Sequence, residues 1–177
     1  MFFFVFLTIY SCQSRKIEIP PSFKPFPTDT TVLSIAPIPS IVKECSGMIK
    51  WKNALWTHND SGGATALYTL NATDGTLKKT YKIKNVTHKD WEAITQDAAY
   101  LYIGDYGNNH GSRKDLRIYK IDKASIENNL STTKVDTINF AYPDQKDFSG
   151  PTHQHNYDCE AMIAVGDSLY LLSLIHI

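Results

Sequence analysis

Acidic residues open three similar segments of the sequence, and their repetition is the first sign of chemistry. The segments read ECSGMIKWKNALW, DWEAITQDAAYLY and DCEAMIAVGDSLY, and the acids they contribute are Glu44, Asp90, Glu92, Asp158 and Glu160. Carboxylates gathered at one place repel each other, which raises some of their pKa values or requires a cation. A hard divalent ion such as Ca²⁺ takes carboxylate and amide oxygens as ligands. The repeated acids therefore predict a metal site.

Further oxygen donors follow the first two segments, where THNDSGG and IGDYGNN place Asp and Asn beside glycine. We expect Asp105 to be an additional metal ligand. We expect a bound ligand to contact the remaining side chains of these loops, Asn59, Asp60, Asn108 and Asn109. The alternative is structural, because Asp and Asn beside glycine form turns and bond nearby backbone groups. The repeated acids would then cap loop amides and hold neighbouring sheets together.

A catalytic role for the same acids is a second hypothesis. A bound ion would polarise an ester, lactone or phosphate oxygen and activate water. Glu92 or Glu160 would then act as the general base. His58 would serve as a base or as a ligand.

The three acidic segments also predict the elements that carry them. In each, a Leu follows the opening acid by eleven positions, and an aromatic residue comes next: these are Leu55–Trp56, Leu101–Tyr102 and Leu169–Tyr170. The first two segments start 46 residues apart, at positions 44 and 90. Blades of β-propellers repeat with a period of about 40–50 residues. The third segment starts 68 residues after the second, so we expect a polar insertion between Lys123 and His155.

Short apolar and aromatic runs separated by turn residues predict strands throughout residues 41–171. DKASIENNL is the one short helical candidate. We expect an all-β fold, a partial β-propeller of about three blade repeats in which the acids gather at one end of the axis. The alternative is a coincidental series of β-hairpins in a sandwich.

Two cysteines occupy the same position in the first and third segments, Cys45 and Cys159. A disulfide requires Cα atoms within about 7 Å of each other, and equivalent positions of non-adjacent blades are farther apart. We therefore expect both cysteines to be small buried hydrophobic residues rather than a disulfide.

Several of these motifs together resemble a known group of proteins. LWTHNDSGG, DWEAI, YIGDYGNN, RKDLRIYKI and YDCEAM are similar to uncharacterised secreted or lipid-anchored β-propeller proteins of Bacteroidetes-type bacteria. They are more distantly similar to phytase-like esterase and gluconolactonase-type propellers. The resemblance covers residues 44–170 and implies a fold rather than an activity.

The N-terminal segment, MFFFVFLTIYSC, has the apolar core of a secretory signal. The cysteine after a small residue resembles a bacterial lipoprotein processing site. We therefore expect residues 1–12 to be a signal segment ending at a lipidated Cys12, and the Pro-rich residues 13–40 to be a tether. The protein would be an exported periplasmic or outer-membrane lipoprotein of a Gram-negative bacterium. The alternative is a buried N-terminal strand with an inert cysteine.

The last six residues, LSLIHI at 172–177, match a translation of CTGTCTCTTATACACATCT, the transposase mosaic-end adapter of sequencing libraries. We expect this segment to derive from adapter DNA, so His176 is not a candidate ligand. A propeller typically has four to eight blades, so we also expect the chain to be part of a longer protein. The alternative is a genuine C-terminus.

The balance of acidic and basic residues indicates which class of partner the protein binds. The chain has 18 basic and 18 acidic residues, and this balance disfavours nucleic acid as a partner. We expect the membrane as a partner through the lipid anchor at Cys12, together with a small-molecule or protein ligand. The first functional hypothesis is a binding module of the cell envelope with an axial Ca²⁺ site. The second is a metal-dependent esterase, lactonase or phytase-like phosphatase.

Overall fold

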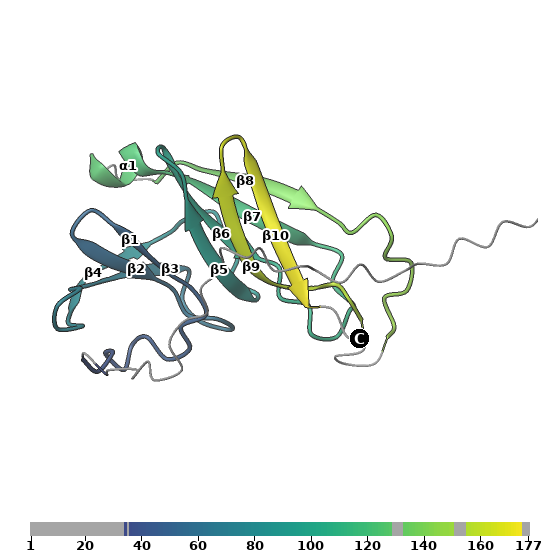
Figure 1. Ribbon diagram of the computed structural model, residues 1–177, viewed down its shortest axis with the longest axis horizontal. Helices are drawn as coiled ribbons and strands as arrows, with labels where there is room; N and C mark the ends of the chain where they lie inside the picture. Colours follow the sequence, from purple (N-terminus) through teal and green to yellow (C-terminus); the bar gives the residue numbers. More distant parts are fainter. Residues whose placement is uncertain (1–33, 35, 129–132, 151–154, 175–177) are drawn as a thin grey trace, which may run out of the picture. The chain divides into compact units, whose positions relative to one another are not determined.

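A computed structural model describes residues 34, 36–128, 133–150 and 155–174, and these residues form three antiparallel sheets in chain order (Figure 1). The first sheet contains β1 (Met48–Trp51), β2 (Ala54–Thr57), β3 (Ala66–Leu70) and β4 (Leu77–Lys82). The second contains β5 (Trp91–Gln96), β6 (Tyr100–Asp105), β7 (Leu116–Asp122) and β8 (Val135–Phe140). The third contains β9 (Asp158–Val165) and β10 (Ser168–Leu174). The expectation of an all-β chain is confirmed.

Neighbouring strands in each sheet are also neighbours in the sequence, so each sheet is built from consecutive antiparallel strands. The turns after β1 and β9 contain a residue with a positive φ, which is Lys52 (φ 52°) in the first and Gly166 (φ 56°) in the second. The predicted helix is a single turn, α1 (Lys123–Glu127), whose first turn is capped by the Asp122 side chain. Helix α1 lies between β7 and β8, and β8 is the last strand of the second sheet. The long connection to β9 therefore begins after Phe140.

Equivalent residues of the three acidic segments occupy equivalent places in the three hairpins. The first set of paired residues is Met48–Thr57 in β1–β2, Ile94–Ile103 in β5–β6 and Met162–Leu171 in β9–β10. The next set is Ile49–Trp56, Thr95–Tyr102 and Ile163–Tyr170. The hairpin register therefore follows the alignment of the segments. Strand β10 includes Leu172–Leu174, the first half of the LSLIHI segment.

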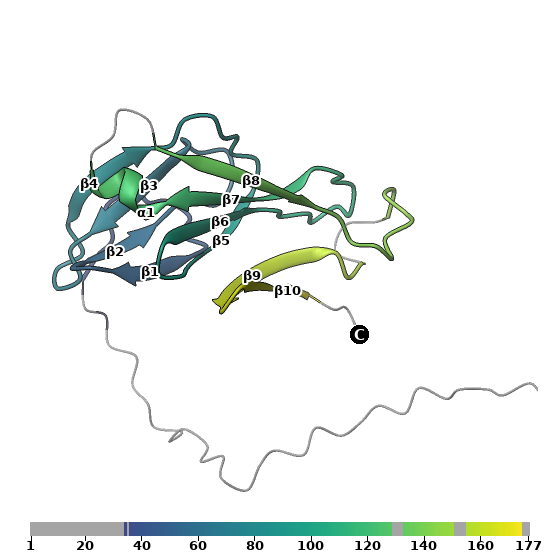
Figure 2. The same ribbon diagram turned by 90° about the horizontal axis from the view of Figure 1, so that it is seen from above.

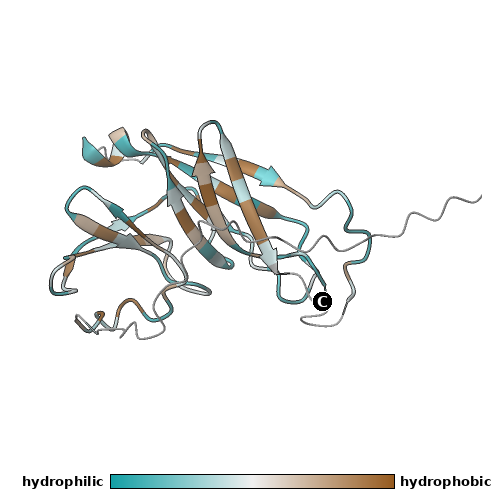
Figure 3. Ribbon diagram, viewed as in Figure 1, coloured by the Kyte–Doolittle hydropathy of each residue, from teal (hydrophilic) through white to brown (hydrophobic). Residues whose placement is uncertain are grey.

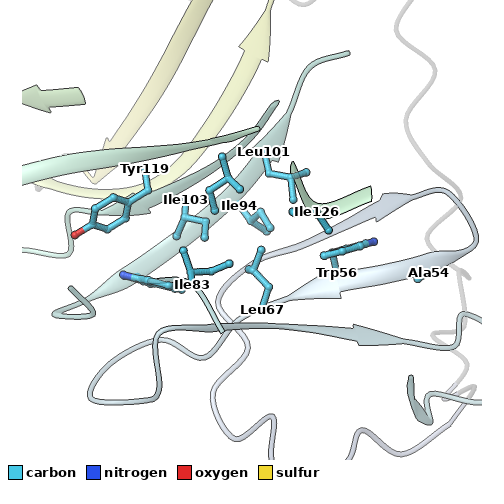
Figure 4. Close-up of a cluster of buried hydrophobic side chains, with 11 residues drawn as sticks. Ala54, Trp56, Leu67, Ile83, Ile94, Leu101, Ile103, Tyr119 and Ile126 are labelled. Carbon is cyan, nitrogen blue, oxygen red and sulfur yellow. The ribbon is translucent and has the colours of Figure 1, made fainter. Parts of the chain in front are cut away.

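The sheets pack on one another through two apolar clusters, and β5 contacts both β1 and β9. Trp56 and Leu67 of the first sheet meet Ile94 and Leu101 of the second (Figure 4). On the opposite face of the second sheet, a cluster that includes Tyr102 and Ile118 meets Met162. Figure 2 shows β9 and β10 as a separate layer beside the second sheet. Full burial of one such side chain contributes about 1.5–3 kcal/mol, so these two clusters hold the acid-bearing strands together.

The two cysteines have different surroundings. Cys45 and Cys159 are both free thiols, and Cys159 is buried as expected. The expectation is wrong for Cys45, which is exposed. Cys159 lies within β9 against the second sheet, whereas Cys45 precedes β1. Equivalent positions of the repeat therefore differ in burial, because a side chain is buried only where a neighbouring sheet packs over it.

Candidate functional site

Three of the predicted acids meet where the first two sheets join. Asp60 lies in the loop after β2, Asp90 directly precedes β5, and Glu92 lies in β5. One carboxylate oxygen of each lies within 4.8 Å of the others. The loops that carry them are tied together, because the Trp91 amide donates to the Asp60 carbonyl over 3.1 Å and Ser61 forms a β-bridge with Asp90.

Two matching β-bulges aim a glutamate from each of two sheets. In the second sheet Trp91 pairs with Asp105 and Ala93 pairs with Gly104, which leaves Glu92 as the extra residue. In the third sheet, Cys159 pairs with Ser173 and Ala161 pairs with Leu172, which leaves Glu160 as the extra residue. Bulges re-aim a side chain and are common beside functional sites. Here the two re-aimed carboxyl groups influence each other electrostatically, because the charge of Glu160 contributes to the raised pKa of Glu92.

The acids perturb one another strongly. Burial, followed by the negative charges of Asp60 and Glu160, raises the pKa of Glu92 to about 8. Burial also raises the pKa of Glu160. The pKa values of Asp60 and Asp90 are raised as well, mainly by burial and then by the charge of a neighbouring acid, which is Glu44 for Asp60 and Asp60 for Asp90. The pKa values of all four acids are raised, so a cation bound among them would be favoured.

A glycine makes room for this arrangement. A Cβ on Gly107 would lie 2.2 Å from Glu92 Oε1 and 2.3 Å from Asp90 Oδ2. Any larger residue would collide with both carboxylates. Gly107 was not singled out in the sequence, because glycine in YIGDYGNN suggests only a turn.

His88 holds the loop that carries Asp60. Its Nδ1 lies 3.0 Å from the Ala64 carbonyl oxygen, its Nε2 contacts the Asp60 carbonyl oxygen, and its ring stacks on Trp91 at 4.3 Å between centroids. Sequence reasoning missed this residue, since nothing in the pattern of KNVTHKDWE indicates what its histidine contacts.

Asp105 has quite different surroundings from the clustered acids. Its carboxylate is fully buried and lies 3.1 Å from Arg113 Nη2. It also accepts the Asp90 amide over 3.1 Å and the Tyr119 hydroxyl over 3.4 Å. The guanidinium already balances its charge, so we leave Asp105 out of the proposed metal site.

Two other predicted acids lie beside the cluster. Asp158 is buried and accepts the Asn108 amide over 2.8 Å. Its charge contributes to the raised pKa values of Glu92 and Glu160. Glu44 is exposed, its charge raises the pKa of Asp60, and its carbonyl accepts the Asp60 amide over 2.8 Å.

Two of the predicted amide ligands, Asn59 and Asn108, already use their side chains in hydrogen bonds within the protein. Asn59 donates to the Ile41 carbonyl over 3.0 Å and accepts the Lys43 amide over 3.1 Å, so it fastens the segment before β1. Asn108 donates to the Tyr157 carbonyl over 2.9 Å and accepts the Arg113 amide over 2.8 Å. These two fit the structural alternative.

An open pocket lies beside the acids. It has a volume of about 360 Å³, and Asn109 lines it together with Asp90, Ser61 and Gly107. Its wall is polar, and it gives a ligand from solution access to the Asp90 side of the cluster.

His58 is placed away from this pocket. It is fully buried, its Nδ1 lies 2.9 Å from the Asn59 carbonyl oxygen, and burial lowers its pKa to about 4. The Nε2 atom lies beside Gly47 and has no hydrogen-bond partner. His58 is therefore neutral near pH 7, and the clustered acids do not include it.

The remaining expectations concern the N-terminal part of the chain. Cys12, the signal segment and nearly all of the tether lie outside the described residues. Among the residues that the structure does describe, no helix has the length and hydropathy needed to cross a membrane.

Comparison of the sequence with protein-family models and with curated proteins gives no match. The function must therefore be argued from the site.

Proposed function

We propose that this chain is a binding module of the bacterial cell envelope, built as part of a β-propeller, that holds Ca²⁺ among acids contributed by its three sheets. The observation that carries the proposal is the cluster of Asp60, Asp90 and Glu92, whose carboxylate oxygens lie within 4.8 Å of one another. Glu160 occupies a matching bulge in the neighbouring strand β9. The module is exported and is anchored to the membrane by lipid at Cys12. Its polar pocket takes a small-molecule or protein ligand next to the ion.

The stacking of the sheets supports the propeller. The first strand of each sheet contacts the first strand of the next, as β1 contacts β5 and β5 contacts β9. Within each sheet the strands are neighbours in sequence order, as the strands of a propeller blade are. In a propeller this arrangement brings Asp90, Glu92 and Glu160 towards one axis.

The donor set supports Ca²⁺. Asp60, Asp90, Glu92 and Glu160 supply carboxylate oxygens, which are hard ligands suited to hard cations. Gly107 leaves the space that two of these carboxylates require. Ca²⁺ takes six to eight oxygens in flexible geometry, so water and a ligand in the pocket could complete its coordination. The ion would offset the burial and the mutual repulsion that raise the four pKa values.

The second candidate is a metal-dependent hydrolase acting on an ester, a lactone or a phosphate ester. The pKa of Glu92, about 8 without a cation, favours it, because a general acid or base works best near the ambient pH. The pocket beside Asp90 would admit the substrate. In this case Glu92→Gln would abolish hydrolysis of model esters, lactones or phosphate esters, whereas a pure binding module would show no hydrolysis in the unaltered chain.

Calorimetric titration of the chelator-treated protein with CaCl₂ tests the proposal. We expect a saturable site whose affinity falls at least about tenfold in Glu92→Gln, which corresponds to about 1.4 kcal/mol. Asp136→Asn is the matched control, because Asp136 is an exposed acid of β8 and lies outside the cluster. Absence of Ca²⁺ binding to the unaltered chain, or equal affinity in both variants, would contradict the proposed site.

A further inference from the structure

The loop between β6 and β7, residues 106–115, depends on hydrogen bonds for its position. Most of its residues are hydrophilic (Figure 3), so apolar packing cannot hold most of the loop in place. Arg113 supplies several of the bonds: its Nη1 atom donates to the Gly107 carbonyl over 2.9 Å, and its Nη2 atom donates to the Asp105 carbonyl over 3.0 Å. Nη2 also lies 3.1 Å from the Asp105 carboxylate, and the Arg113 side chain is 15% exposed. Arg113 therefore fixes the backbone from Asp105 to Gly107.

The same stretch of backbone is bonded to two of the acidic segments. The Gly107 amide donates to the Asp90 carbonyl over 3.2 Å, and the Asp105 carboxylate accepts the Asp90 amide over 3.1 Å. On the other side, the Asn108 amide donates to the Asp158 carboxylate over 2.8 Å. A displacement of this backbone would therefore move the second acidic segment relative to the third.

The loop also sets the space that is open to the carboxylates. A Cβ on Gly107 would lie 2.2 Å from Glu92 Oε1 and 2.3 Å from Asp90 Oδ2. Because Arg113 holds the carbonyl of this glycine, it determines how closely the backbone approaches the two oxygens. Its charge acts on Asp90 as well: burial and then the charge of Asp60 raise the pKa of Asp90, whereas the charge of Arg113 lowers it. Arg113 thus favours the ionised form of Asp90, which is the form that binds a cation.

A second arginine shows what charge balance alone would require. Arg117 is 21% exposed, and it pairs with the Asp115 carboxylate as Arg113 does. It also donates to the Asp115 carbonyl over 3.0 Å and to the Thr87 hydroxyl over 3.4 Å. These bonds engage the end of the loop and not the stretch beside the carboxylates. The two arginines therefore share a partner and a similar exposure, and they differ in the backbone that they hold.

We propose that Arg113 is a positioning residue of the cation site, which holds the backbone of Asp105 and Gly107 so that the carboxylates of Asp90 and Glu92 meet one cation together. The proposal rests on the proposed Ca²⁺ site. It adds that a residue outside the set of ligands determines the spacing of that set. Residues that orient metal ligands in this way typically change the affinity for the metal by about 10–100-fold when they are replaced.

The Arg113→Lys variant tests this role. Lysine keeps a positive charge beside the buried Asp105, but it lacks the planar fork that reaches two carbonyl groups at once. Removal of the charge would instead leave Asp105 buried without its partner and would destabilise the fold. Arg117→Lys is the matched control, and circular dichroism will verify that both variants are folded. In calorimetric titrations with CaCl₂ we expect the affinity to fall about 10–100-fold in Arg113→Lys and to be unchanged in Arg117→Lys.

Luminescence of bound Tb³⁺ separates positioning from a general effect on stability. Tb³⁺ is a hard cation similar in size to Ca²⁺, and its luminescence lifetimes in H₂O and D₂O report how much water it binds. If Arg113 positions the carboxylates, the ion should bind more water in Arg113→Lys than in the unaltered chain or in Arg117→Lys. A purely stabilising role would lower the Tm and leave the hydration of the ion unchanged.

The outcomes separate this role from the cation site itself. Equal Ca²⁺ affinity in the two lysine variants would overturn the role of Arg113 and leave the site in place. A lower affinity with unchanged Tb³⁺ hydration would also overturn it, since Arg113 would then act on stability alone. Absence of Ca²⁺ binding to the unaltered chain would overturn the site and the role together.

Discussion

At the scale of single residues, the acidic side chains differ in whether a positive charge or a hydrogen-bond donor lies next to them. Asp105 lies beside Arg113, the Asp90 amide and the Tyr119 hydroxyl, so its charge is balanced within the protein. Glu92 is buried and has other carboxyl groups as its principal charged neighbours, and both effects raise its pKa. The same residue type is therefore structural in one position and a candidate ligand in the other.

The raised pKa of Glu92 predicts how the stability of the metal-free protein depends on pH. The folded-state pKa, about 8, lies above the ordinary value of 4.5, so the folded protein binds the proton more tightly. This contribution to stability is fully present below about pH 4.5 and is lost as the pH rises through about 8. The pKa values of Asp60, Asp90 and Glu160 are also raised, so they act in the same direction.

His58 acts in the opposite direction at lower pH, because its pKa falls from 6.5 to about 4 on folding. The effect of Glu92 is therefore best measured between about pH 7 and 9, where His58 is neutral in both states. We expect the Tm in EDTA to fall over this range, CaCl₂ to restore it, and Glu92→Gln to flatten the dependence. A Tm profile that is the same in Glu92→Gln as in the unaltered chain would show that Glu92 is not the titrating group.

At the scale of elements, the site depends on irregularities in regular strands. The bulges in β5 and β9 turn Glu92 and Glu160 out of the alternation of their strands. The loop after β6 then approaches closely, because Gly107 has no side chain to keep it away from the carboxylates. The hairpins provide the scaffold, and the bulges and this loop create the cluster.

Gly107→Ala tests this close approach. The added Cβ would overlap Glu92 Oε1 and Asp90 Oδ2, so the carboxylates must move apart. We expect a loss of about 1–3 kcal/mol in the free energy of unfolding, as for other overpacked sites, and weaker Ca²⁺ binding. Gly150→Ala is the control, because a Cβ there has nothing within 4 Å. Equal Ca²⁺ affinity in the two alanine variants would argue against a cation site at Gly107.

At the scale of the whole molecule, the three described sheets pack in chain order, because β5 of the second sheet contacts both β1 of the first and β9 of the third. The acids meet only because these contacts bring the first strands of neighbouring sheets together.

The sequence by itself determined the hairpins and their register. Alternating apolar residues and turn residues act locally, so the pairing of Ile49 with Trp56 recurs as Thr95 with Tyr102 and as Ile163 with Tyr170. The sequence also indicated most of the acids that meet in the cluster.

Only the tertiary structure decided which of those acids face one another. Asp60 joins Asp90 and Glu92 because a loop of the first sheet packs against the start of β5. Asp105 is engaged instead by Arg113, eight positions away and around a loop. Cys45 and Cys159 share one position in the repeat, yet one is exposed and the other is buried. Contacts between sheets depend on residues far apart in the chain, and no local pattern specifies them.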